Sequence, residues 1–217
     1  LQVTREQANT GAELDLDLTV EPATLTGLAY LDANANGAFD EGEDVLEDAI
    51  VSVGNTTATT DAAGQYTLEG LLPGRTVVDA ALDGYRTRGA NQVDLVGGEV
   101  QEHNISMEFT PVTVRGVVED QAGEETEGIE AVFAPVNGSE TARENSAFSQ
   151  INGTLTLDLQ PGTYMVGGNG TINNQTLEIV SVEVTGGTGA SVDEDGNLVI
   201  DPRATSVEVL LKVAPVE

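Results

Sequence analysis

Residues 32–43 form the segment of this chain whose residue types and spacing indicate a definite chemistry. They read DANANGAFDEGE and fit the twelve-residue calcium-loop pattern D-x-[DN]-x-[DN]-G-x5-E at every specified position. Ca²⁺ takes about six to eight oxygen ligands, which such a loop supplies at alternate positions. The predicted ligands are the side chains of Asp32, Asn34, Asn36, Asp40 and Glu43 and the backbone carbonyl of Ala38. Asp, Asn and Gly also dominate ordinary turns, but the complete match favours a calcium site.

Strand-forming rather than helical sequences flank this loop. Residues 24–31 before it and residues 49–53 after it are rich in β-branched and other apolar residues. The usual context of the pattern is a pair of helices. A bound ion would here hold a loop between two strands.

The charge of the chain restricts its partners and its environment. There are 37 Asp and Glu against 8 Lys and Arg, a formal net charge of −29. Nucleic acid is excluded as a partner because phosphate binding needs clustered basic residues. The hydrophobic fraction of 39% occurs in alternating runs, which favours a folded chain over disorder. Such a surface resembles the proteins of halophiles, whose charge molar salt screens, and predicts a haloarchaeal or other salt-adapted source.

Residue types needed for most catalytic sites are missing from the sequence. There is no cysteine, and His103 is the single histidine, in the strand-like segment 100–109. Histidine-dependent triads and thiolate zinc sites are therefore excluded. The sequence also lacks a P-loop, a G-x-S-x-G motif and a dinucleotide-binding fingerprint. We expect a protein that is not an enzyme.

Six N-x-[ST] sequons indicate export and covalent N-glycans. A threonine-rich β protein also acquires some sequons by coincidence. No signal peptide is visible, and no stretch of apolar residues is long enough to span a membrane. We expect an extracellular or cell-surface location. The candidate glycosylation sites are Asn55, Asn104, Asn137, Asn152, Asn169 and Asn174.

An internal repeat predicts two modules. Residues 67–78 align with residues 156–166, both containing a Pro-Gly pair after an alternating run. The repeat spacing matches the size of a β-sandwich domain, and short runs separated by Asp-Gly, Asn-Gly and Pro-Gly indicate strands and turns. We predict an all-β chain of tandem Greek-key, Ig-like β-sandwiches. Module one is residues 23–110 and module two is residues 111–217.

Module one resembles a known group of domains. The resemblance is carried by the calcium loop, by residues 49–53 and 60–66, and by Leu72-Pro73-Gly74. Over residues 24–109 the chain resembles the B-type repeats of staphylococcal Sdr adhesins and the wider Cna-B-like and carboxypeptidase-regulatory-like domains. The resemblance implies a prealbumin-like sandwich that serves as an extracellular spacer stiffened by calcium.

The same resemblance makes module two, over residues 112–214, a second and divergent copy. Residues 120–127 replace the calcium loop with a shorter acidic turn, so a second site of this kind is not expected. Residues 193–197 are interpreted as an Asp-Gly hairpin turn.

Residues 13–20 predict a β-strand that belongs to neither module. Leu and Val alternate strictly with polar residues there, and the segment ends at Pro22, as residues 102–109 end before Pro111 and residues 206–213 before Pro215. Two interpretations remain open. The segment, with residues 1–22, is either the last strand of a preceding module in a longer array or a donor strand that adds to a neighbouring subunit.

These observations predict a structural cell-surface protein, a calcium-stiffened segment of a filament, stalk or S-layer. Its partners would be other copies, through residues 13–20, or neighbouring modules of a longer chain. The alternative is an adhesin or glycan-binding module that recognises a host or neighbouring cell surface. Exposed aromatic residues usually mark such a module, and this chain has no Trp, four Tyr and four Phe. Tyr85 is the best surface candidate among them.

Overall fold

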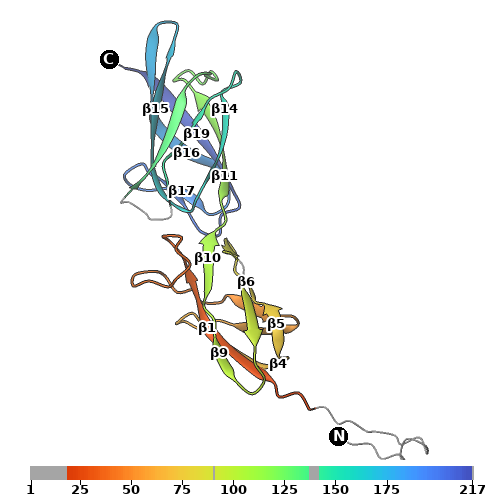
Figure 1. The fold of residues 1–217 in the computed structure, drawn as a ribbon. Coiled ribbons are helices and arrows are strands. Elements are labelled where there is room, and N and C mark those ends of the chain that lie inside the picture. The colour runs from red at the N-terminus through yellow and green to blue at the C-terminus, as the bar shows by residue number, and fades with distance from the viewer. Residues whose placement is uncertain (1–18, 90, 137–141, 217) are drawn as a thin grey trace, which may run out of the picture.

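A computed structural model describes residues 19–89, 91–136 and 142–216. Every named element within these ranges is a β-strand, and the described residues contain no helix that could cross a membrane. Figure 1 shows two β-modules placed end to end, with a narrow waist between them. The predicted all-β fold of tandem β-sandwiches is therefore confirmed.

Short strands, many of them of alternating burial, build module one. β4, β1, β10 and β7 form one sheet in that order, β9 also pairs with β1, β3–β2–β6 form a second sheet, and β5 pairs with β8. The strands are β1 (Ala23–Leu31), β2 (Ile50–Val53), β3 (Thr56–Thr59), β4 (Gln65–Leu71), β5 (Gly74–Val77), β6 (Asp79–Ala81), β7 (Tyr85–Thr87), β8 (Gln92–Leu95), β9 (Val100–Glu102) and β10 (Ile105–Phe109).

Longer strands form a larger sheet in module two. Its order is β13-β12-β15-β16-β19-β11-β14, with the β17–β18 hairpin attached to β15. The strands are β11 (Val112–Glu119), β12 (Glu130–Pro135), β13 (Asn145–Phe148), β14 (Thr154–Leu159), β15 (Gly162–Ile172), β16 (Gln175–Gly187), β17 (Ala190–Val192), β18 (Leu198–Ile200) and β19 (Ser206–Pro215).

Both modules pair their first and last strands in parallel. β1 lies parallel to β10, and β11 lies parallel to β19. The antiparallel partner of the first strand is β4 in module one and β14 in module two, the two strands that the sequence repeat aligns. Only Thr110 and Pro111 separate β10 from β11. The last strand of one module thus leads almost directly into the first strand of the next.

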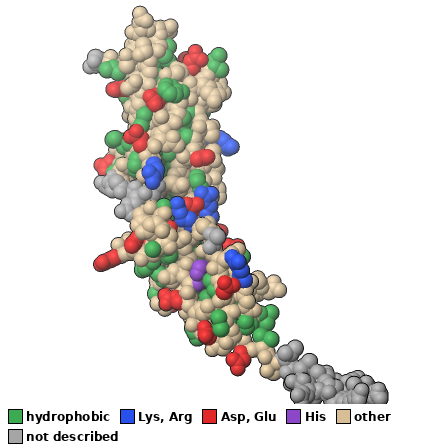
Figure 2. Space-filling model, in the orientation of Figure 1, with side chains coloured by type: hydrophobic (Ala, Val, Ile, Leu, Met, Phe, Trp, Pro, Cys, Tyr) green, Lys and Arg blue, Asp and Glu red, His purple; other side chains and the backbone are tan. Residues whose placement is uncertain are grey.

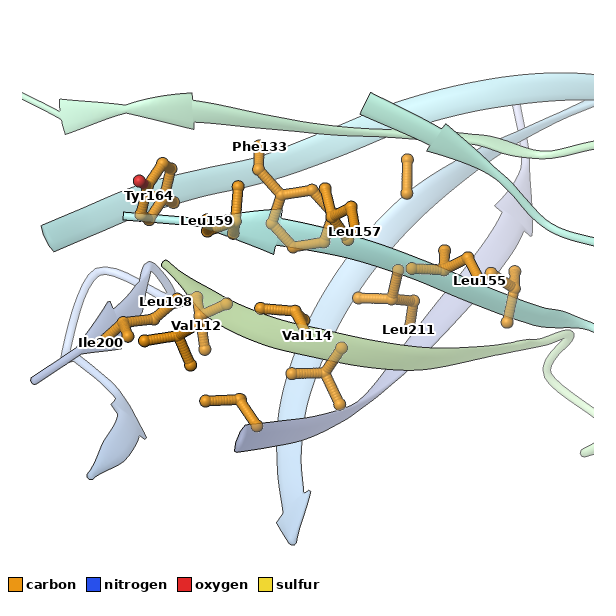
Figure 3. Packing of buried hydrophobic residues seen from close by; sticks show 14 of the residues in the cluster. Val112, Val114, Phe133, Leu155, Leu157, Leu159, Tyr164, Leu198, Ile200 and Leu211 are labelled. Atoms are coloured by element: carbon orange, nitrogen blue, oxygen red, sulfur yellow. The ribbon is translucent and has the colours of Figure 1, made fainter. Parts of the chain in front are cut away.

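Each module has its own hydrophobic core. One cluster of buried residues runs from Ala23 to Met107 and the other from Val112 to Val213. Figure 3 shows side chains of β11, β12, β14 and β19, including Val114, Phe133 and Leu211, pointing toward one another in module two. Alternation in the sequence located these faces correctly, because successive strand residues point to opposite sides of a sheet.

Three of the four tyrosines are buried. Tyr30, Tyr66 and Tyr164 are at most 3% exposed. Tyr164 donates its hydroxyl proton to the Gln160 carbonyl, 2.8 Å away, and burial raises the pKa of Tyr164 to about 12. Tyr85 packs against Phe109 with 5.0 Å between the ring centroids. It is therefore a packing residue at the end of module one.

His103 supplies a pH-dependent element in module one. Its Nε2 atom is buried and has no hydrogen-bond partner among the described residues. Burial lowers the pKa of the imidazole below its ordinary value of 6.5 because a buried ring without a partner disfavours the charged form. The folded protein therefore favours the neutral imidazole.

We expect acid to destabilise module one through His103. As the pH falls below about 6.5, the unfolded chain binds a proton that the folded chain does not, so the free energy of unfolding decreases until the folded pKa is passed. One proton limits the slope to about 1.4 kcal/mol per pH unit, and partial exposure of the ring reduces it. Urea unfolding of wild type and of His103→Gln, each at about pH 7.5 and about pH 5.8, measures this decrease in the free energy of unfolding. An equal pH effect in both proteins would exclude His103 as its source.

Candidate calcium site

Asp32 begins the loop immediately after β1 and is the most enclosed of the predicted ligands. The residue is 2% exposed. Its Oδ1 accepts a hydrogen bond from the Asn36 amide at 3.1 Å, and its Oδ2 accepts one from the Gly37 amide at 3.0 Å. Gly37 has φ of 77°, a left-handed conformation that glycine adopts without strain. The chain therefore turns tightly around the first carboxylate.

Glu43 closes the other end of the loop. Its Oε1 accepts a hydrogen bond from the Ala33 amide at 3.0 Å, and its Oε2 accepts one from the Asp40 amide at 3.1 Å. The Leu31 amide donates to the Asp44 carbonyl at 2.8 Å, which returns the chain to the end of β1. The first and last predicted ligands are thus held by the same short stretch of backbone.

Asn34, Asn36 and Asp40 meet between these two carboxylates. The Nδ2 atoms of Asn34 and Asn36 donate to Asp40 Oδ2 at 2.9 and 2.6 Å. These hydrogen bonds hold the pKa of the Asp40 carboxyl below its usual range. A half-turn of either amide presents its oxygen in place of its nitrogen. Ala38, the sixth predicted ligand, donates its amide proton to Asn36 Oδ1 at 2.7 Å.

The donor set consists of carboxylate, amide and backbone oxygens, which hard cations such as Ca²⁺ prefer. Among the described residues, no three His, Cys, Asp or Glu side chains gather as a metal cluster by themselves. A site in this loop would therefore depend on the asparagine oxygens as well as on the acids.

Two aromatic residues anchor the loop on the module. Tyr30 and Phe39 contact each other edge to face, with centroids 5.3 Å apart. Burial raises the pKa of Tyr30, and the negative charges of Asp32 and Glu43 raise it further. Phe39 is 42% exposed. The Tyr30–Phe39 contact thus fixes the middle of the loop, in addition to the hydrogen bonds that hold its two ends.

Arg88 is a residue of the site that sequence reasoning missed. Its Nε lies 3.8 Å from Asp32 Oδ2, and its Nη1 lies 3.0 Å from Glu108 Oε2. Arg86 pairs with the other oxygen of Glu108 at 2.7 Å. The alternation of Arg86 and Arg88, in a chain with few cations, was the available signal. The pairing connects the loop to β10, the strand that leads into the linker.

Both acidic segments of module two form tight turns closed by an aspartate side chain. Asp120 Oδ1 accepts hydrogen bonds from the Ala122 and Glu124 amides at 2.8 and 2.9 Å. In the turn between β17 and β18, Asp193 Oδ1 likewise accepts a hydrogen bond from the Asn197 amide at 2.8 Å. The interpretation of residues 193–197 as a hairpin turn is confirmed.

The sequons in the described part of the chain are accessible. Two lie in hairpin turns, at Asn55 and Asn174, and Asn104 Oδ1 accepts the Leu28 amide at 3.0 Å. Asn137 lies outside the described residues. The exposed candidates are Asn55, Asn104, Asn152, Asn169 and Asn174.

Most of the predicted strand 13–20 also lies outside the described residues. Residues 19–22 are described, and they are exposed and do not form a strand within this chain. Val20 is 61% exposed. Neither module buries it.

Comparison with known families agrees with the resemblance found in module one. The family model of the carboxypeptidase regulatory-like domain matches residues 38–108. Module one is therefore similar to that family over most of its length, as its motifs predicted. A search of curated proteins finds no match.

Solved structures similar to this chain have low sequence identity. The Bacillus anthracis TIE protein is 17% identical with a TM-score of 0.47, over 90% of this chain and 34% of that chain. The shaft pilin SpaA of Lactobacillus rhamnosus GG is 12% identical with a TM-score of 0.30, over 92% and 100%. The minor pilin GBS52 of Streptococcus agalactiae is 14% identical with a TM-score of 0.35, over 90% and 98%. This chain thus spans about a third of the TIE protein.

Proposed function

We propose that this chain is a non-enzymatic structural segment of an extracellular filament, stalk or S-layer, in which calcium stiffens module one. The observation that carries the proposal is the connection between the modules. The last strand of module one passes through Thr110 and Pro111 into the first strand of module two, which is how modules are joined in a linear array.

The same connection recurs in the sequence before module one. Val20-Glu21-Pro22 precedes β1 as Phe109-Thr110-Pro111 precedes β11. In module two, Val207, Val209, Leu211 and Val213 of the last strand are buried. Leu14, Leu16, Leu18 and Val20 have the same spacing and the same distance to the following proline. This correspondence supports residues 13–20 as a last strand whose partner is a preceding module or another copy.

Exposed apolar residues lie near residues 19–22, where Gly97 is close to Glu21 and Pro73 and Val100 pairs with Thr24. The exposed residues are large and apolar, each with at least 46% exposure, and such a patch on a soluble domain often marks an interaction surface. A neighbouring module or subunit would cover this patch together with the strand. The patch consists of Val20, Leu72, Val96 and Val100.

Calcium in loop 32–43 fits a stiffening role. The loop connects the end of β1 to the rest of module one, and its five side-chain donors are already gathered by hydrogen bonds. When bound, the ion supplies charge compensation for Asp32, Asp40 and Glu43 and holds their oxygens together. N-glycans at the exposed sequons and a salt-rich environment complete the proposal.

Deleting residues 1–21 is expected to abolish self-association and to leave both modules folded, because both cores lie between Ala23 and Val213. Burying four apolar side chains contributes on the order of 6 to 10 kcal/mol before entropy is counted. Sedimentation velocity in molar NaCl, with circular dichroism for folding, measures the outcome. Deleting only residues 1–12 is the matched control. Assembly of the 1–21 deletion like the full chain would contradict a role for the strand.

A further inference from the structure

The two modules meet through turns at the narrow waist visible in Figure 1. In addition to the linker at Thr110 and Pro111, residues 83–85 of module one face residues 201–203 of module two. Together with Val45, Leu46 and Leu82, these turns line a hollow of about 400 Å³. The joint is therefore built from small contacts rather than from a continuous packed face.

Gly84 is the tightest point of this joint. A Cβ atom built on it would overlap the carbonyl oxygen of Pro202 in module two. The Gly84 carbonyl also accepts the Thr110 amide proton at 2.9 Å. With φ of 86°, Gly84 allows both contacts, so one residue holds the linker and touches the neighbouring module.

The proposed calcium loop forms one wall of the same joint. Leu31, Ala33, Gly42 and Asp44 line a hollow of about 800 Å³, whose opposite wall is residues 161–163, 189–191 and 199–202 of module two. A smaller hollow, of about 190 Å³, has Asp32 and Arg88 on one side and Arg143 and Gln160 on the other. The loop therefore lies between the modules.

Acidic and basic side chains both lie at the joint between the modules. Tyr85 is close enough to Asp44 and Asp201 for both to raise its pKa, after the larger effect of burial, while Arg203 lowers it. Figure 2 shows Lys and Arg side chains near the waist. Asp44 of module one and Asp201 of module two line the same hollow, whereas Asp32 shares the smaller hollow with Arg88 and Arg143. Repulsion between the negative charges of Asp44 and Asp201 would favour an open arrangement of the joint.

We propose that calcium in loop 32–43 sets the angle between the two modules, an inference that rests on the calcium site of the proposed function. Domains that meet through a small interface are expected to move relative to each other. Binding orders the wall formed by the loop and offsets two of its negative charges. The joint then closes at the contact between Gly84 and Pro202. Calcium thereby restricts the motion of module two relative to module one, in addition to stiffening module one.

The absence of cysteine allows a direct test by paired spin labels. Glu69→Cys in β4 and Thr156→Cys in β14 place labels on exposed positions of the two modules. Double electron–electron resonance is then measured in Ca²⁺ and in chelator. We expect a distance distribution at least roughly twofold narrower in Ca²⁺. In Glu43→Gln the narrowing should be lost.

Gly84→Ala tests the contact itself. The variant is expected to bind Ca²⁺ by calorimetry but to keep the broad distribution, because the new methyl group pushes Pro202 away. Gly54→Ala is the matched control, since Gly54 also has a positive φ, 59°, and open space around its Cβ position. A Gly84→Ala distribution as narrow as wild type in Ca²⁺ would overturn the proposed joint.

Asp201→Asn tests the charge without altering module one. Asparagine retains the acceptor for the Arg203 amide, now 2.8 Å from Asp201 Oδ1. The distance distribution in chelator should move toward that in Ca²⁺, and an unchanged distribution would show that Asp201 does not hold the joint open. If wild type binds Ca²⁺ but its distance distribution does not narrow, the proposed control of the module angle is wrong and the calcium site stands. If wild type does not bind Ca²⁺, both the calcium site and its control of the module angle are wrong.

Discussion

Replacing Glu43 by glutamine is expected to abolish calcium binding by residues 32–43. The carboxylate supplies two oxygens at the closing position of the loop, whereas an amide offers one and carries no charge. With Asn at two ligand positions, we expect a wild-type dissociation constant of about 10⁻⁴ to 10⁻³ M. Titration calorimetry measures the loss.

The same substitution removes the calcium-dependent stability of module one. At a free Ca²⁺ concentration about 100 times the dissociation constant, binding stabilises the folded state by about 2.7 kcal/mol. For a module of this size, this is a shift in Tm on the order of 10 °C. Thermal melts in Ca²⁺ and in chelator measure the shift, which should vanish in Glu43→Gln.

Glu47→Gln is the control for the calcium prediction. Glu47 is an exposed acid just after the loop, so its substitution makes the same charge change and leaves every predicted ligand in place. It should bind Ca²⁺ as wild type does. Equal binding by wild type and Glu43→Gln would show that the ion is held elsewhere on this acidic surface.

Salt is expected to stabilise the whole chain. A net charge of −29 is self-repulsive in the folded state, and raising NaCl from about 0.1 M to about 1 M shortens the Debye length from about 10 Å to about 3 Å. Each kcal/mol recovered by screening should raise Tm by about 2 to 4 °C in a protein of this length. Melts across the NaCl range, with Ca²⁺ saturating, separate screening from site binding.

A charge-reduced variant provides the matched comparison for the salt effect. Glu124, Glu125 and Glu127 are exposed in the acidic turn after β11, so replacing all three with glutamine lowers the charge without touching either core. The dependence of Tm on salt should become shallower. A wild-type Tm that does not respond to NaCl would argue against adaptation to a saline environment.

Local sequence determined the features that depend on neighbouring residues. The ligand pattern of residues 32–43 lies on consecutive positions, so its glycine turn and gathered side chains follow from the residues themselves. Alternation placed Tyr66 on the buried face of β4 and Leu157 on that of β14, because strand side chains have a period of two. The all-β class and the end strands preceding proline followed in the same way.

Only the tertiary structure brought together residues far apart in the chain. Arg88 reaches Asp32 because β7 pairs with β10 and β10 with β1, and no local pattern encodes that order of strands. The contact between Gly84 and Pro202 depends on how one module is placed on the other. Local propensity acts over a few residues, whereas strand order and module placement depend on which surfaces can be buried together. The position of the loop at the joint is therefore a property of the folded pair.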